Sequence, residues 1–192
     1  MTTKQWYRYF LDSDIINFTL EDGSASKRLC RVERSRPDID WDSIWTRIKI
    51  PSLPSAITSF LWKLEHDLLT TEVRINATLG NISATCRFGC GVVADLEHCF
   101  FRCCLTDNVG NWLLNLIRKF EPTNEDKILK ISLLNEALIW TVAMTLHFIW
   151  SRRAASKIAE LHLCVALLKA EVEIMKDTKF NGLADEITKV IS

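Results

Sequence analysis

The chain has 192 residues, 48% of them hydrophobic, and its Lys plus Arg equal its Asp plus Glu at 24 each. This length and apolar content suffice for one domain with a genuine core, with or without an extension, and exclude a disordered tail. The zero net charge excludes an overall basic field for nucleic acid, so any such contact must come from a local patch. Only 6 Gly and 4 Pro occur, which favours a mainly α fold over strands and turns.

Residues 1–40 are predicted to form an N-terminal extension. Within it, Lys27, Arg31 and Arg34 fall on one side of a helix, and Arg28 lies beside them. This is the best basic stretch in the sequence and a candidate nucleic-acid contact, although a solvated helix or linker explains the same charges. Residues 1–11 lack the apolar core of a secretory signal, which predicts an intracellular location, in the nucleus or the cytoplasm.

Residues 41–120 are predicted to form a compact domain. A core-facing helix is expected first, because five apolar residues recur at helical spacing. Thr71 can cap a short second helix that carries Ile75 and Leu79, and Gly80 stands where a helix favours a left-handed stop. The five residues of the first stripe are Ile57, Phe60, Leu61, Leu64 and Leu68.

The next segment holds Cys86, Cys90, His98 and Cys103 in the order Cys-x3-Cys-x7-His-x4-Cys. Three thiolates and one imidazole suit tetrahedral Zn²⁺, and a site that uses all four positions is structural, since none is left for water or substrate. The chain has 7 cysteines, an odd number, and a reducing compartment disfavours disulfides, so metal is favoured over a coincidental set of buried cysteines. Gly89 can take the positive φ that a tight turn between the first two ligands demands.

Residues 96–104 are expected to enter a helix that directs His98 and Cys103 to one ion, with the phenylalanines at 100 and 101 packed beside it. Three thiolates and one Zn²⁺ leave about one net negative charge, which Arg87 and Arg102 can offset. The same arginines, with Phe88 as a stacking aromatic, are candidate nucleic-acid contacts. Both interpretations of the arginines stay open.

Residues 121–192 are predicted to be a C-terminal helical region, after a helix from Val109 to Phe120. Residues 133–150 are apolar almost all round, and their uninterrupted apolar run is shorter than the roughly 20 residues that span a bilayer. A buried central helix is therefore predicted, with no membrane partner. Arg152, Arg153 and Lys157 follow it, either as phosphate ligands or as solvated charges.

The last long segment carries six apolar residues in strict alternation of three and four, as in the seam of a coiled coil. Such a narrow seam predicts one partner helix. That partner is either an earlier helix of the same chain or the same helix in a homodimer. The six residues are Ile158, Leu161, Val165, Leu168, Val172 and Met175.

The stretch from 41 to 120 resembles the zinc-binding domain of reverse transcriptases from non-LTR retrotransposons. The resemblance rests on an ordered set: a tryptophan-rich lead, an aromatic helix, a Leu-Thr-Thr stop, the Cys-Cys-Glu-His-Cys motif and a later tryptophan. The first two ligands are separated by three residues where the family usually has two. In this chain the set comprises Trp41, Trp45, residues 60–64, residues 69–71, Cys86, Cys90, Glu97, His98, Cys103 and Trp112.

The resemblance implies a non-catalytic module with structural Zn²⁺ that helps a reverse transcriptase engage RNA or DNA, here as a fragment or a domesticated copy. No Asp-Asp pair occurs in the sequence, so no polymerase metal site and no catalytic residue are predicted. The alternative is a helical protein-interaction or dimerisation module in which the metal only fixes a loop. The predicted fold is thus a small helical domain with a zinc-stapled knuckle loop and long C-terminal helices.

Overall fold

The computed structural model describes residues 46, 49–65, 68–80, 82–120 and 135–192. Lys27, Arg28, Arg31 and Arg34 lie outside the described residues. Helices make up the regular structure of the described part, which contains no strand, and the predicted mainly α class is confirmed. The elements are α4 (Ser55–Glu65), α5 (Glu72–Leu79), the π-helical turn η1 (His98–Arg102), α6 (Asp107–Phe120), α8 (Glu136–Ala154), α9 (Leu161–Lys176) and α10 (Asn181–Ile191).

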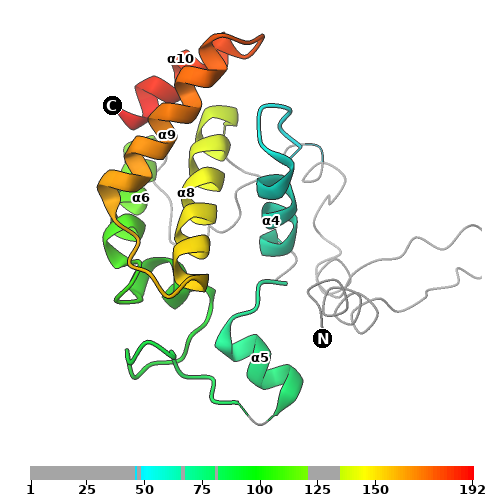
Figure 1. Cartoon of the computed structure of the whole chain (residues 1–192), viewed down its shortest axis with the longest axis vertical. Helices are drawn as coiled ribbons and strands as arrows, with labels where there is room; N and C mark the ends of the chain where they lie inside the picture. Colours follow the sequence, from blue (N-terminus) through cyan, green and yellow to red (C-terminus); the bar gives the residue numbers. More distant parts are fainter. Residues whose placement is uncertain (1–45, 47–48, 66–67, 81, 121–134) are drawn as a thin grey trace, which may run out of the picture.

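Helix α8 is the centre of the fold and contacts α4, α6, α9, α10 and η1. Asn135 caps its start by accepting a hydrogen bond from the Leu138 amide at 2.9 Å. Its apolar side chains are buried on nearly every side, and Trp140 and Leu138 are among the largest fully buried residues. Figure 1 shows α8 between α4 on one side and α6 and α9 on the other. The predicted buried central helix is confirmed, and no described helix is long and apolar enough to cross a membrane.

Helix α4 buries the first predicted stripe, with Ile57, Phe60, Leu61 and Leu64 facing the core. The helix ends at Glu65, so Leu68 lies beyond it, and the prediction of a longer stripe was wrong at that end. Helix α6 forms where a helix was predicted from Val109 to Phe120, and it buries Leu113, Leu116 and Ile117, whereas Phe120 at its end is 45% exposed. Gly110 of α6 passes so close to η1 that an added Cβ would lie 2.3 Å from the Phe100 carbonyl oxygen.

Helices α9 and α10 pack on α8 and on each other. Of the predicted seam, Leu168, Val172 and Met175 are buried in this intrachain contact, as the first of the two alternatives requires. Ile158 is 58% exposed because α9 begins only at Leu161. The loop that precedes α9 breaks the heptad pattern, so the six residues do not form one continuous seam. Homodimerisation stays a prediction.

Two parts of the molecule are named below. The helical bundle comprises α4, α6, α8, α9 and α10, and the knuckle comprises residues 82–97, between α5 and η1. Figure 1 shows α5 and the knuckle beyond the lower end of α8, away from α9 and α10. Thr71 caps α5 and Gly80 ends it with φ 71°, as predicted. An antiparallel bridge between Thr85 and Val93 closes the knuckle.

Candidate metal centre

The knuckle loop carries the first two cysteines. Its two sides are held together by the Cys86 amide, which donates to the Val92 carbonyl at 2.8 Å, and by the Ala94 amide, which donates to the Ala84 carbonyl at 2.9 Å. Gly89 has φ 81°, a conformation that other residues rarely adopt. The predicted tight turn at this glycine is confirmed, and it lets three residues separate the two cysteines while both thiols face one point.

The other two ligand candidates flank η1. The Cys103 amide donates to the His98 carbonyl at 2.8 Å, which closes a turn of five residues. In such an i to i+5 turn, residue 103 follows residue 98 after about one full turn. The predicted helical entry at 96–104 is confirmed for residues 96–102, and the structure adds that residues 98–102 form a π-helical turn. Turns of this kind recur at functional sites.

The four predicted ligands come together. One ligand atom from each of Cys86, Cys90, His98 and Cys103 lies within 4.8 Å of the others. The Cys103 sulfur lies 3.8 Å from that of Cys86 and 4.0 Å from that of Cys90. A tetrahedral Zn²⁺ with Zn–S bonds of about 2.3 Å places its sulfurs about 3.8 Å apart. A disulfide needs about 2.05 Å, so the spacing fits a metal tetrahedron and not a disulfide.

His98 gives an independent test of the fit. It is buried, and its Nε2 atom has no hydrogen-bond partner in the described structure. A buried imidazole nitrogen without a partner carries a desolvation cost that a metal ion removes. The His98 amide donates to the Asp95 side chain at 2.8 Å, which anchors the start of η1. The residues present therefore fit a Cys3His metal site.

Arg153, at the end of α8, reaches into this cluster. One of its nitrogens, Nη1, lies 3.1 Å from the Cys103 sulfur and 3.9 Å from the Cys86 sulfur. The other, Nη2, donates to both carboxylate oxygens of Glu72 at 2.8 Å. Arg153 is only 3% exposed, and Glu72, the first residue of α5, is also buried. The solvated charge that the sequence offered as one interpretation of Arg153 is thus wrong.

The three candidate nucleic-acid contacts of the knuckle region have different surroundings. The Arg87 Nε atom lies 3.6 Å from the Glu72 carboxylate, and its side chain is 53% exposed. Phe88 lies beneath two guanidinium groups, with Arg87 at 4.9 Å and Arg153 at 4.8 Å from its ring centre. Arg102 pairs with Glu97, and its side chain is 63% exposed. Arg153 is thus a cation in direct contact with the sulfurs that the sequence analysis did not assign to them.

The thiols of the cluster differ in acidity. Burial opposes ionisation of Cys86, but hydrogen bonds from the Phe88 backbone, His98 and Arg153 together lower its pKa below the ordinary 9.0. The Cys104 amide, which donates to the Cys90 sulfur at 3.5 Å, lowers the pKa of Cys90. Burial raises the pKa of Cys103 to about 12. A cation that binds here must displace the Cys103 proton, so binding is coupled to proton release.

Of the other cysteines in the described residues, Cys99, Cys104 and Cys164 lie outside this group of ligand atoms. Cys99 and Cys164 are buried, and burial raises the pKa of each to about 12. Cys104 is exposed. It follows Cys103 directly, and its thiol lies 3.7 Å from the Phe88 carbonyl oxygen.

Sequence reasoning found the four ligands but missed Glu72 and Arg153. Helical phase could have indicated Arg153, because it follows the buried Leu146 and Ile149 by seven and four residues and so shares their side of α8. Glu72 offered no such signal, since an acidic residue in the first turn of a helix is ordinary. The role of Glu72 depends on how α5 docks beside the end of α8. Glu72 and Arg153 are 81 positions apart in the chain.

Comparison of the chain with protein-family models, curated proteins and solved structures gave no match. The geometry itself establishes a mainly helical domain with a buried Cys3His cluster that can bind a metal ion such as zinc.

Proposed function

We propose that this chain is a non-catalytic zinc-binding module, derived from the reverse transcriptase of a non-LTR retrotransposon, that assists the binding of RNA or DNA. The convergence of Cys86, Cys90, His98 and Cys103 carries the proposal. Three sulfurs and one imidazole are a donor set that prefers Zn²⁺, and because they fill all four positions the metal would be structural. Thiols that bind zinc must stay reduced, so an intracellular location accompanies the proposal.

The retrotransposon origin rests on the ordered motif and on the places its parts take in the fold. The aromatic helix is α4, the Thr71 stop is the cap of α5, and the Glu-His pair stands at the start of η1. These parts of the motif therefore have separate structural tasks, while Trp41 and Trp45 lie outside the described residues. A coincidental cluster of cysteines would not explain the flanking parts.

The nucleic-acid role is supported by exposed cations beside the knuckle. Arg87 and Arg102 each stand next to a metal ligand and keep more than half of their side chains exposed. Cations on a rigid loop can bind phosphates at little entropic cost, and such binding weakens as salt rises. Arg87 and Arg102 would need to exchange their contacts with Glu72 and Glu97 for phosphates, which limits the expected affinity.

The first experiment is the zinc content of protein purified under reducing conditions. We expect about one zinc per chain in the native protein and none in Cys86→Ala or His98→Ala. Cys104→Ala is the matched control, because this exposed thiol is adjacent to a ligand in the sequence but outside the ligand group. A folded native protein without zinc would refute the proposal.

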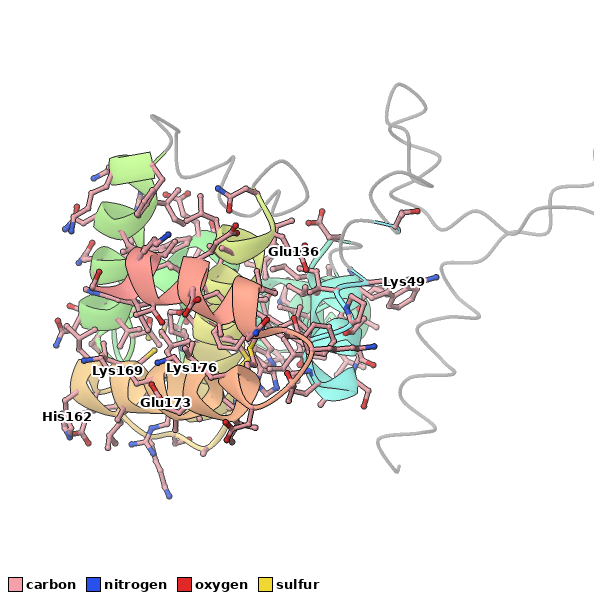
Figure 2. The ribbon with its side chains drawn as sticks, turned by 90° about the horizontal axis from the view of Figure 1, so that it is seen from above. Lys49, Glu136, His162, Lys169, Glu173 and Lys176 are labelled. Atoms are coloured by element: carbon pink, nitrogen blue, oxygen red, sulfur yellow. The ribbon has the colours of Figure 1, made fainter. Side chains whose placement is uncertain are left out.

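The second experiment is the affinity for single-stranded RNA and DNA at several salt concentrations. Arg87→Ala and Arg102→Ala should each weaken binding and make the salt dependence shallower. Lys169→Ala serves as a control, since Lys169 is an exposed cation on α9 (Figure 2), remote from the knuckle. Binding that ignores salt and both arginines would argue against the nucleic-acid role.

A protein-interaction module is the second candidate, and the outer side of α9 favours it. Leu163, Leu167 and Ile174 are exposed there, at 39%, 37% and 63%. They differ from the predicted homodimer residues, three of which the chain itself buries.

If two copies associate through this side, Ile174→Asp should abolish a concentration-dependent dimer in analytical ultracentrifugation. Leu168→Asp should instead disrupt folding, because Leu168 is fully buried.

A further inference from the structure

We propose that Glu72 and Arg153 belong to the metal centre: Arg153 binds the ligand thiolates and neutralises their charge, and Glu72 holds Arg153 in place. This inference rests on the proposed zinc site. It adds two residues that lie outside the motif, 14 positions before its first ligand and 50 positions after its last.

The first argument is geometric. Arg153 divides its guanidinium group between two anionic partners, so that Nη1 faces the Cys103 and Cys86 sulfurs while Nη2 faces the Glu72 carboxylate. The planar fork of arginine allows this division, whereas the point charge of a lysine does not. The 2.8 Å contacts of Nη2 to both carboxylate oxygens fix the group, so its second nitrogen remains directed at the sulfurs.

The second argument is the charge balance. Three thiolates and a divalent ion carry about one net negative charge, and Arg153 cancels it. Glu72 adds a negative charge, and Arg87, 3.6 Å from the same carboxylate, cancels that one. The charges of the metal, its three thiolates, Arg153, Glu72 and Arg87 thus sum to zero. An uncompensated charge at this depth would be costly, because Arg153 and Glu72 are both buried.

The third argument is connectivity. Glu72 begins α5, Arg153 stands in the last turn of α8, and the sulfurs belong to the knuckle and to the end of η1. One guanidinium group therefore joins the metal ligands to two helices. Groups that surround metal ligands in this way orient them, and their loss typically weakens metal affinity by about 10- to 100-fold.

The test is the zinc dissociation constant, measured by competition with a chromophoric chelator. Arg153→Met should raise the dissociation constant by about 10- to 100-fold. Arg153→Lys should raise it less, since lysine keeps the positive charge but lacks the paired N–H donors of the guanidinium group. Arg153→Met alone removes the bidentate partner of the buried Glu72 and leaves it only the half-exposed Arg87 at 3.6 Å, so the double variant Glu72→Gln with Arg153→Met is included to keep the fold. Circular dichroism of the helices reports whether each variant is folded.

Arg152→Met is the matched control. Arg152 is the neighbouring arginine, and it donates to the Ile158 carbonyl at 2.9 Å instead of to the sulfurs. This variant should bind zinc as the native protein does. Substitution with Co²⁺ adds a spectroscopic readout: the sulfur-to-cobalt charge-transfer band should shift when the N–H donor to the Cys103 sulfur is lost, and it should stay unchanged in Arg152→Met.

The outcomes distinguish a failure of the zinc site from a failure of the role of Arg153. A native protein that binds no metal would overturn both the zinc site and the role of Arg153. A native protein that binds zinc, together with a folded double variant of equal affinity and unchanged Co²⁺ spectrum, would overturn the role of Arg153 alone. Weaker binding and a shifted band in the double variant, with neither in Arg152→Met, would establish it.

Discussion

The helical bundle and the knuckle are stabilised in different ways. The core of the bundle is continuous from α4 to α10 and includes large, fully buried side chains such as Trp140, Leu138 and Leu168. The second cluster has four small buried residues, Cys86, Ala94, Cys99 and Cys103, with the partly buried Phe88, Cys90, Leu105 and Trp150 packed against them. Burial of a large apolar side chain contributes about 1.5–3 kcal/mol, so the bundle has ample driving force. The knuckle buries little apolar surface of this kind, so it depends on the proposed metal centre for its stability.

The two parts meet at a few aromatic residues. The ring centre of Phe100 in η1 lies 5.8 Å from that of Trp150 in α8 and 6.4 Å from that of Phe60 in α4. Trp150 also contacts the small cluster that holds the thiols. This arrangement ties η1 firmly to the bundle and leaves the loop from Thr85 to Val93 dependent on the metal centre. Metal binding and bundle stability should therefore be separable by experiment.

The largest expected effect is that of metal removal on the knuckle. Structural zinc sites contribute about 10–16 kcal/mol of apparent binding free energy at neutral pH, far more than the small cluster can replace. Chelation should abolish the protection of the Cys86 and Ala94 amides in hydrogen exchange, whereas amides in the middle of α8 should keep theirs. Equal loss of protection in both parts would show that the bundle also requires the metal.

The converse change is Leu168→Ala in α9. Leu168 is fully buried against the rest of the bundle, and truncation of such a leucine costs about 2–5 kcal/mol. Denaturant unfolding should show this loss, while the zinc content of the folded protein should not change. Leu167→Ala, one position away and 37% exposed, should change stability by no more than about 0.5 kcal/mol. A loss of zinc in Leu168→Ala would mean that the two parts are coupled more tightly than their contacts indicate.

The same contrast explains what the sequence could predict. Apolar residues at helical spacing were sufficient to locate α4 and α6, and the all-round apolar segment was sufficient to predict α8 as a buried helix, because both patterns can be recognised within one segment. The Cys3His cluster was also predictable, since its residue types and close spacing in the sequence are those that a metal site requires. Both kinds of signal lie within short segments.

The missed features depend on contacts between distant segments. The pairing of Glu72 with Arg153 requires α5 to dock beside the end of α8, and no local pattern contains that information. The π turn of η1 is set by the need to place His98 and Cys103 on one point and Gly110 against the Phe100 carbonyl. The predicted seam was misread at Ile158 because the break between α8 and α9 has no proline or glycine to mark it.

A smaller effect is expected at the cap of α5. The Thr71 side chain accepts a hydrogen bond from the Arg74 amide at 3.2 Å, and replacing such a cap by alanine costs about 1 kcal/mol. Because α5 belongs to the knuckle side of the molecule, Thr71→Ala should speed hydrogen exchange in α5 without lowering the global unfolding free energy by the same amount. Thr71→Ser keeps the acceptor and should restore protection. A global loss equal to the local one would place α5 within the cooperative unit of the bundle.

The smallest effect concerns pH and the bundle. Burial lowers the pKa of His147 below its ordinary 6.5, and its ring lies 5.3 Å from that of Phe60, edge to face. Between the lowered pKa and 6.5 the unfolded chain binds the proton and the folded chain does not, so stability falls as pH drops through this range. His147→Leu should reduce the dependence of unfolding free energy on pH below 6.5, measured with denaturant at a fixed zinc concentration. His162→Gln is the control variant, because it replaces a histidine whose side chain is 73% exposed. Acid would also protonate the proposed metal ligands, so the contribution of His147 is read from the difference in pH dependence between these two variants. If the unfolding free energy of both variants depends on pH identically, the acid sensitivity belongs to the knuckle and not to His147.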